Sequence, residues 1–327
     1  MQAVAGVISG RLGLVGCTLM ASAIACSVPA AAMEPWQIGH GPFVTASDVT
    51  KHNRMPLDIA DVNAALATEP RDWDAAIARF AYGGNFPNHS LALFTDNYHG
   101  RFENHLPDAV AHFGNPNFMH HQLFAALVGS GEYRPMSEDE RAAFIEAGLQ
   151  AVSLNWSRYE LGESRRKATM AEPNWSLENG SPKNWNEIFA FYYGPDGEHS
   201  TFETMAAIDG GTEINDALIA VLAEGQDILV TETWTDEHAE QVEDHLDRAS
   251  VLILAAALET SQDADEDAMF LARARTLGAW LAAAEALGAD DAVVTAIGGL
   301  REAEPKALAE PVAAVSDAIQ PHLSAAN

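Results

Sequence analysis

The sequence predicts an all-α protein, because helix-start signals and helical spacing of apolar residues are frequent and strand patterns are nearly absent. Ser137 and Glu140 form a capping box, the arrangement that satisfies free backbone amides where a helix begins. Apolar residues follow at helical intervals from Phe144 to Trp156. Alanine, the strongest helix former, is frequent throughout the chain. We therefore expect helices that pack as in a bundle.

Two further helix starts are visible in the second half of the chain. Ser181 precedes Pro182, and these residue types are favoured at the cap and the first helical position of a helix that would continue to Tyr193. Thr235 is expected to begin another helix, which would continue through Leu258. Glycine and proline clusters predict loops at 83–87, 114–116 and 194–197.

The first 32 residues have the layout of a secretory signal. Arg11 is their only basic residue, no acidic residue is present, and an apolar stretch of about fourteen residues leads to three consecutive alanines. That stretch is short for a membrane span, which needs roughly 20 residues. We predict cleavage after Ala32 and a periplasmic or secreted protein. Lipidation of Cys26 stays open as an alternative, because residues 23–26 resemble a lipobox.

Composition limits the classes of function. The only cysteines, Cys17 and Cys26, lie in or beside the signal, so we expect neither a disulfide nor a zinc–cysteine site in the mature chain. The chain has 18 basic and 47 acidic residues and a net charge of −29, which becomes −30 when Arg11 leaves with the signal. This charge excludes nucleic acid as an expected partner and suits a cation or a neutral ligand. Solubility alone is an equally simple reason for it.

The two halves of the chain resemble each other. Residues 70–74 match residues 182–186 at a shift of 112, and matches continue in order until Trp156 meets Trp280 at a shift of 124. We predict an internal duplication in which the second copy has extra residues between Gln226 and Asp244. A site shared by both copies would lie near their pseudo-two-fold axis. The expected segments are a signal (1–32), an irregular segment (33–56), repeat 1 (57–167), repeat 2 (168–300) and a tail with at most short helical pieces (301–327).

Histidines and carboxylates at helical spacing are the most specific chemical signal. His199 and Glu203 are four residues apart, a spacing that puts two side chains on one helix face. The duplication pairs His89 with His199. Helical bundles bind iron and manganese through such groups on facing helices. The candidate metal ligands are His89, His121, His199, Glu203, His245, Glu237, His99 and Glu103. Each histidine has a plainer alternative as a surface or helix-capping group.

Motifs of common enzymes are missing. The sequence has no G-x-S-x-G, no HExxH, no phosphate-binding G-x-x-x-x-G-K-[ST] and no G-x-G-x-x-G. These absences argue against the common serine hydrolases, zinc proteases and nucleotide-binding enzymes.

Residues 184–194, Asn-Trp-Asn-Glu-Ile-Phe-Ala-Phe-Tyr-Tyr-Gly, resemble the N-W-[DN]-E-x-x-A-F-Y-x-G stretch of a known family. These are the Fe-assimilating (FEA1-like) extracytoplasmic proteins induced by low iron or high CO2. The resemblance implies export, repeated helical units and a link to iron uptake, but it carries no ligand across residue by residue. Imelysin-like periplasmic proteins are a weaker comparison, because Glu203 comes one residue too late after His199 for their G-x-H-x-x-E motif.

Three functions are compatible with these patterns. The first is an extracytoplasmic protein that captures iron, as Fe2+ or Fe3+, and passes it to a membrane iron transporter, with manganese as a second candidate ion. The second is a metal-dependent enzyme of the ferroxidase type. The third is a periplasmic binding or structural protein without a metal.

Overall fold

The computed structural model describes residues 34–259, 266–304, and 307–325 of the 327-residue chain, so the predicted signal lies outside the described residues. Helices make up nearly all the regular structure, and the all-α prediction is confirmed. The exception is one short antiparallel pair, β1 (Gly39–His40) and β2 (Phe43–Val44), in which Gly39 is opposite Val44. None of the described helices is long and apolar enough to cross a membrane.

The first part of the chain forms short helices. In order they are η1 (His52–Arg54), α1 (Met55–Leu66), α2 (Trp73–Tyr82), α3 (Leu91–Thr95), η2 (Tyr98–Gly100), α4 (Arg101–His105), α5 (Pro107–Phe113), α6 (Phe118–Leu127) and η3 (Gly131–Tyr133). The second part forms longer ones: α7 (Glu138–Thr169), α8 (Ser181–Tyr193), α9 (Thr201–Ala206), α10 (Gly211–Leu229), α11 (Asp236–Glu259), α12 (Glu266–Leu287), α13 (Asp291–Glu302) and α14 (Ala309–Ala325).

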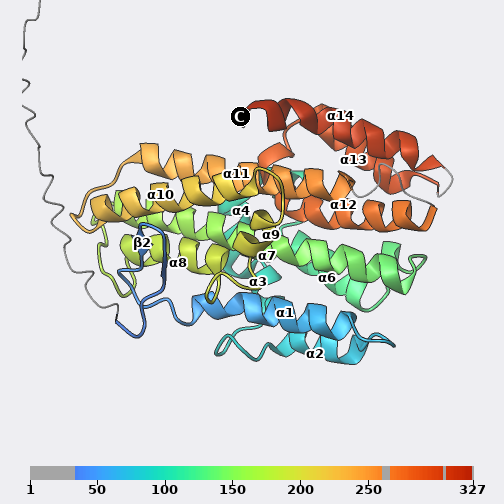
Figure 1. The fold of residues 1–327 in the computed structure, drawn as a ribbon. Helices are drawn as coiled ribbons and strands as arrows, with labels where there is room; N and C mark the ends of the chain where they lie inside the picture. Colours follow the sequence, from blue (N-terminus) through green and yellow to red (C-terminus); the bar gives the residue numbers. More distant parts are fainter. Residues whose placement is uncertain (1–33, 260–265, 305–306, 326–327) are drawn as a thin grey trace, which may run out of the picture. The chain divides into compact units, whose positions relative to one another are not determined.

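Helices α7 and α8 are the centre of the fold. They lie between α10, α11 and α12 on one side and α1 on the other (Figure 1). In α8 every side chain except Lys183 is buried, as expected of a helix surrounded by protein along its length. Trp156, Trp185 and Trp280 are buried in this core, where their large side chains remove much apolar area from water.

Two of the three predicted helix starts agree with the structure, and the third is displaced by one residue. The capping box at Ser137 is confirmed, since its Oγ accepts from the amide of Glu140 at 3.2 Å and Glu140 Oε2 accepts from the amide of Ser137 at 2.8 Å. Thr235 Oγ1 accepts from the amide of His238, which confirms the start of α11. The predicted cap at Ser181 is one residue late, because Gly180 is the N-cap and Ser181 is already helical.

The tail differs from the prediction of short helical pieces at most. Helix α14 has 17 residues, even though Pro311 and Pro321 lie within it. Pro311 is in the first turn, where backbone N–H groups lack an intrahelical partner and a proline removes no bond.

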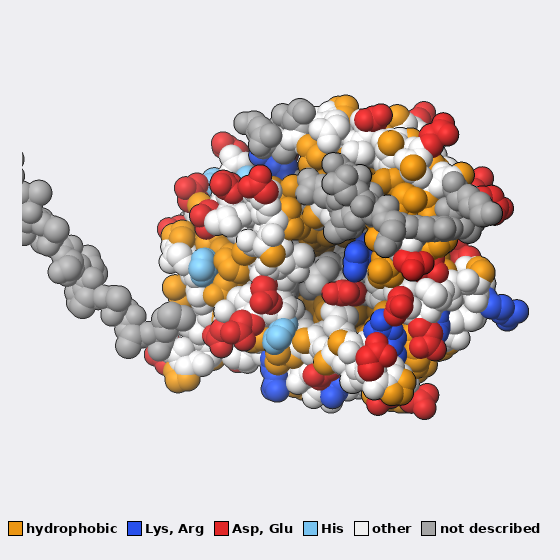
Figure 2. Space-filling model, turned by 45° about the vertical axis from the view of Figure 1, so that its right-hand side comes forward, with side chains coloured by type: hydrophobic (Ala, Val, Ile, Leu, Met, Phe, Trp, Pro, Cys, Tyr) orange, Lys and Arg blue, Asp and Glu red, His pale blue; other side chains and the backbone are white. Residues whose placement is uncertain are grey.

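Residues 34–327 form one compact unit, and α7 runs across the predicted repeat boundary at 167/168. The duplication stays a prediction. Acidic side chains are spread over the visible face while lysine and arginine occupy fewer positions, in keeping with the charge (Figure 2).

Candidate functional site: a carboxylate and imidazole cavity

A cavity of about 180 Å³ lies beside α7 and α8, between these helices, η1, α3, α4 and the loop of residues 83–89. Aromatic side chains form much of its wall, and charged groups from several elements point to it. Its lining residues are His52, Phe86, His89, Phe94, Arg101, Trp156, Tyr159, Glu160, Glu163, Lys167, Asn184 and Phe191.

The buried carboxyl group of Glu160 lines this cavity, and a second buried carboxyl group, that of Glu187, is its neighbour outside the lining. Glu160 on α7 is 4% exposed and Glu187 on α8 is 6% exposed. The side-chain amide of Asn184 donates to Glu160 and, at 3.3 Å, to Glu187 Oε2, so it joins the two. Burial, together with the neighbouring charge of Glu187, raises the pKa of the Glu160 carboxyl well above its ordinary value. Two buried carboxyls in contact need a proton or a cation between them to reduce their repulsion. This pair therefore favours binding of either a proton or a cation.

His52 is the third polar group and comes from η1. Its Nε2 lies 3.2 Å from Glu187 Oε1, and Lys183 Nζ lies 3.5 Å from the same oxygen. Burial lowers the pKa of His52, so burial favours the neutral imidazole. Its Nδ1 is buried and has no hydrogen-bond partner. A neutral imidazole nitrogen without a partner is available to bind a metal ion or another ligand.

His89 is the fourth group, and it is the one predicted ligand that lines the cavity. It ends the loop of residues 83–89 and directly precedes Ser90, the N-cap of α3. Its ring centroid lies 5.0 Å from that of Phe86 and 5.7 Å from that of Phe94. Its Nδ1 is also buried and unpartnered. The cavity is thus lined by the Glu160 carboxyl, which neighbours Glu187, and by two imidazoles that each have a buried nitrogen without a hydrogen-bond partner.

Arg101 and Tyr159 line another part of the cavity. The Arg101 guanidinium lies 5.0 Å from the Trp156 ring centroid and 5.8 Å from that of Tyr159, and its Nη1 has no partner. Burial raises the pKa of Tyr159 to about 12, which keeps the phenol neutral at pH 7. Burial also acts to raise the pKa of Glu163, but hydrogen bonds and charges from His105 and Arg166 outweigh it and lower that pKa to about 2.

The cavity is not a finished metal centre. Among the described residues, no group of three or more His, Cys, Asp or Glu side chains has an arrangement that could hold a metal ion. Glu160, His52 and His89 line the cavity and Glu187 neighbours Glu160, so side-chain rotation would be needed to bring the four groups onto one ion.

Comparison with known proteins identifies the family. The sequence model of one family, described as Fea1, low iron-inducible periplasmic protein, matches residues 15–232. The chain belongs to the Fea1 family. The match contains all the cavity residues, from His52 to Phe191, and the stretch 184–194 that resembles the family. The family is periplasmic, which agrees with the predicted location outside the cytoplasm. Searches of curated proteins and of solved structures gave no match.

The structure places His199 and Glu203 of this Fea1 protein differently from the prediction. His199 precedes the N-cap residue Ser200 and has a φ of +56°, so it is not helical. Its backbone N–H donates to Glu203 Oε2 at 2.6 Å, and the amide of Glu203 donates to Ser200 Oγ at 3.3 Å. Ser200 therefore caps α9, and the Glu203 carboxylate bonds back to the backbone of His199 before the helix begins, so the expectation that His199 and Glu203 share a helix face was wrong.

His99 and Glu103 also do not share one regular helix face. His99 has a φ of +63° in η2, and its ring contacts that of Tyr98 in a tilted arrangement with 4.0 Å between ring centroids. Glu103 follows in α4 and accepts from Asn97 Nδ2 at 3.3 Å. Because of the kink at His99, the side chains of His99 and Glu103 do not project from one helix face.

The other predicted ligands lie on α6 and α11. His121 is exposed on α6, where its Nδ1 lies 2.6 Å from Asn115 Nδ2. Glu237 is exposed in the first turn of α11. His245 is half-buried on the same helix, and burial lowers its pKa. Apart from His199 with Glu203, no described hydrogen bond or ion pair joins two of the predicted ligands. Their role as ligands stays a prediction.

Sequence reasoning missed Glu160, Glu187 and His52. Glu187 was within reach, because it is the glutamate of the stretch that resembles the family. His52 lies in the segment that was assigned as irregular. Glu160 has no characteristic sequence spacing to the other site residues. Its partners come from different elements and meet only in the folded protein.

Proposed function

We propose that this Fea1-family protein captures iron outside the cytoplasm for uptake, and that its cargo ion binds in the cavity beside α7 and α8. The observation that carries the proposal is the buried pair of Glu160 and Glu187, of which Glu160 lines a cavity together with His52 and His89, whose Nδ1 atoms have no partner. Carboxylate and imidazole donors without a thiolate suit iron or manganese. The low-iron induction in the family description supports iron.

The charge of the site favours exchange of a proton for a cation. Without a cation, the raised pKa of Glu160 keeps a proton in the pair. A metal ion that replaces this proton would attract both carboxylates at short distance in a poorly hydrated environment. Lys183 and His52 already compete for one oxygen of Glu187, so arrival of an ion would rearrange them.

The incomplete ligand arrangement of the cavity suits an ion that is bound and later released. A resident cofactor is normally held by a preformed set of ligands with fixed orientation. Here the ligands would close around the ion when it arrives and separate when it leaves. Handover to a membrane iron transporter is part of the proposal. The ligands predicted from sequence outside the cavity, which are His121, His199, Glu203, His245, Glu237, His99 and Glu103, are kept as a secondary proposal for a surface site.

The test is an affinity measurement on the purified, metal-free mature protein, titrated anaerobically with ferrous iron by competition with a colorimetric chelator. Glu187→Gln and His89→Ala should each weaken binding at least about tenfold, because each removes a donor atom. Glu203→Gln is the matched control, since that carboxyl only accepts a capping bond and should leave the affinity unchanged. Circular dichroism checks that all variants are folded.

Two results contradict this assignment. Unchanged affinity in both Glu187→Gln and His89→Ala, with a loss in Glu203→Gln, moves the site to the surface candidates. Absence of bound iron and of any rise in melting temperature on adding iron contradicts iron capture itself, because tight binding must stabilise the native state.

A further inference from the structure

Asp58 is a buried carboxylate outside the cavity whose hydrogen bonds all go to one loop. It lies on α1 and is 0% exposed. Its Oδ1 accepts from the backbone N–H of Asn85 at 2.9 Å and from Asn85 Nδ2 at 3.1 Å. Its Oδ2 accepts from the backbone N–H of Phe86 at 3.2 Å. A buried carboxylate is costly unless such donors surround it, so Asp58 and this loop conformation depend on each other.

The loop of residues 83–89 is folded tightly around this carboxylate. Gly83 has a φ of +65°, and a Cβ at this position would lie 2.5 Å from the carbonyl oxygen of His89. The first and last residues of the loop are therefore in contact. Arg79 Nη1 donates to the carbonyl of Gly83 at 2.9 Å and lies 3.8 Å from Asp58 Oδ1, which fixes the same end of the loop.

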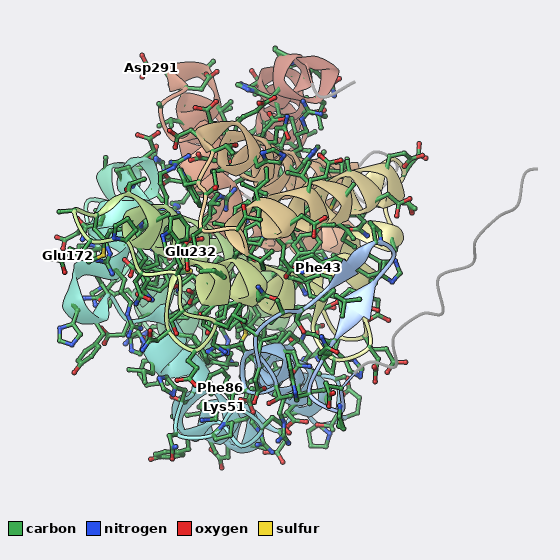
Figure 3. All side chains as sticks on the ribbon, turned by 90° about the vertical axis from the view of Figure 1, so that its left-hand side faces the viewer. Phe43, Lys51, Phe86, Glu172, Glu232 and Asp291 are labelled. Carbon is green, nitrogen blue, oxygen red and sulfur yellow. The ribbon has the colours of Figure 1, made fainter. Side chains whose placement is uncertain are left out.

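This loop carries Phe86 and His89, which line the cavity, and α1 is continuous with the element that carries His52. Helix η1 ends at Arg54 and α1 begins at the next residue, so Asp58 and His52 belong to one run of helical backbone. The Phe86 ring centroid lies 5.5 Å from that of His52 and 5.0 Å from that of His89. Figure 3 labels Phe86 beside Lys51, the residue before His52.

We propose that Asp58 is the positioning residue of the cavity: through the amides of Asn85 and Phe86 it sets the place of His89 relative to His52. The proposal rests on the proposed function, because the two imidazoles are taken as ligands of the cargo ion. Asp58 does not line the cavity, and its effect on cargo passes through His89.

The first experiment needs no metal. In Asp58→Asn one acceptor oxygen becomes an NH2 donor that faces a backbone N–H, so the loop should lose its fixed conformation. Nuclear Overhauser contacts between the rings of His89 and Phe94, 5.7 Å apart at their centroids, should disappear. Contacts between Trp185 and Trp234, which lie outside this region, should remain and serve as the internal control. His89 contacts that persist unchanged in the variant overturn the proposal, whatever the protein does with iron.

The second experiment is a double-mutant cycle with ferrous iron under anaerobic conditions. Asp58→Asn should weaken binding about tenfold, the usual effect of losing support around a ligand. In a His89→Ala background the same change should have less than about a twofold effect, because the residue that Asp58 positions is gone. A merely structural role predicts equal losses in both backgrounds, and that result contradicts the proposal.

Two further variants keep the outcome interpretable. Glu140→Gln alters another buried carboxyl, in the capping box of α7, and should lower stability without changing iron affinity. Asn85→Ala removes the side-chain bonds to Asp58 and Asp61 while the carboxylate stays, so it replaces Asp58→Asn if that variant does not fold. It should show the same pattern with a smaller loss. If the wild-type protein binds no iron, the proposed function fails and the ring contacts still decide the role of Asp58.

Discussion

At the scale of single residues, polar groups in the core are matched by partners from other helices. Arg158 on α7 is 5% exposed, and its guanidinium donates to Asp247 and Ser250 on α11 and to the carbonyl of Ala282 on α12. Burial of a charge is tolerated when every donor is paired in this way. The unpartnered nitrogens of His52 and His89 differ from these paired groups. They also differ from other unpartnered atoms, such as Ser153 Oγ and Thr201 Oγ1, because both histidines line one cavity, which is why they indicate a ligand.

A test at this scale is the pH dependence caused by Glu285 on α12. Burial raises the pKa of this carboxyl to about 7, and its Oε2 accepts from the amide of Ala109 at 3.0 Å. Since the folded pKa lies above the ordinary value of 4.5, the favourable contribution is complete below pH 4.5 and is lost as the pH rises through 7. Glu285→Gln should therefore be more stable than the wild type at about pH 8, by roughly 1–2 kcal/mol allowing for solvent screening.

Urea unfolding at about pH 5 and pH 8 measures this difference, which should nearly vanish at the lower pH. The exposed Glu146 on α7 provides the control, because Glu146→Gln should change stability little at either pH. A Glu285→Gln variant that is less stable than the wild type at pH 8 would show that the carboxylate is better satisfied than its burial implies.

Side-chain environments were only partly predictable from the sequence. Large aromatic area predicts burial of Trp73, Trp156, Trp185 and Trp280. The last three are buried in the core, whereas Trp73 is only half-buried. The candidate site was not predictable, because helical spacing relates side chains within one helix. The cavity joins Glu160, Asn184 and His89 from two helices and a loop, so its composition depends on how those elements pack.

At the scale of elements, helix ends were predictable where the capping chemistry is local, as at Ser137. Spacing failed at His199, which has a positive φ and precedes the N-cap residue Ser200, so it lies outside the helix. Proline in the tail was also misleading, because Pro311 occupies a first turn in which it costs no hydrogen bond. Packing between helices, which sequence spacing does not reveal, is visible in the glycines at the α7–α12 crossing.

Two glycines give opposite predictions at this scale. A Cβ on Gly278 in α12 would lie 2.3 Å from the carbonyl oxygen of Phe144 in α7, so Gly278→Ala must push the helices apart and should cost about 1–3 kcal/mol. Gly298 in α13 is exposed, and no heavy atom lies within 4 Å of a Cβ built there. Gly298→Ala should therefore stabilise the protein by about 0.5–1 kcal/mol, because alanine has less backbone entropy to lose.

Thermal and urea unfolding of both variants, beside the wild type, check these signs. Each variant is the control for the other, since the chemical change is the same and only the surroundings differ. A neutral Gly278→Ala variant would mean that α7 and α12 can separate without loss of packing.

At the scale of the whole molecule, the family match and the folded unit have different ends. The match stops at residue 232, between α10 and α11, while the compact unit continues through α14. Helices α11 and α12 both pack on α7. One local feature recurs in the two predicted repeats, namely a glycine with positive φ that ends a helix. Gly83 ends α2 with a φ of 65°, and Gly194 ends α8 with a φ of 67°. The duplication itself stays a prediction.

A chain that ends after Glu232 should therefore fail to fold cooperatively, because it leaves the α12-facing side of α7 in water. Broad thermal unfolding and binding of a hydrophobic dye are the expected observations. A chain that ends after Ala303 is the control, since it loses α14 alone among the described helices and should keep a sharp transition at a lower temperature. A sharp wild-type-like transition in the shorter chain would show that residues 34–232 are a domain.

The burial of α8 has a consequence for redesign of ion preference. Glu187 sits on a helix in which every side chain except Lys183 is enclosed, so a change on this side of the cavity also disturbs the core. The loop of residues 83–89 is different, because Gly84, Pro87 and Asn88 are exposed. A library of variants aimed at a new ion should therefore vary these loop positions and leave the helices intact. Ion selectivity can then change while the helical scaffold stays the same.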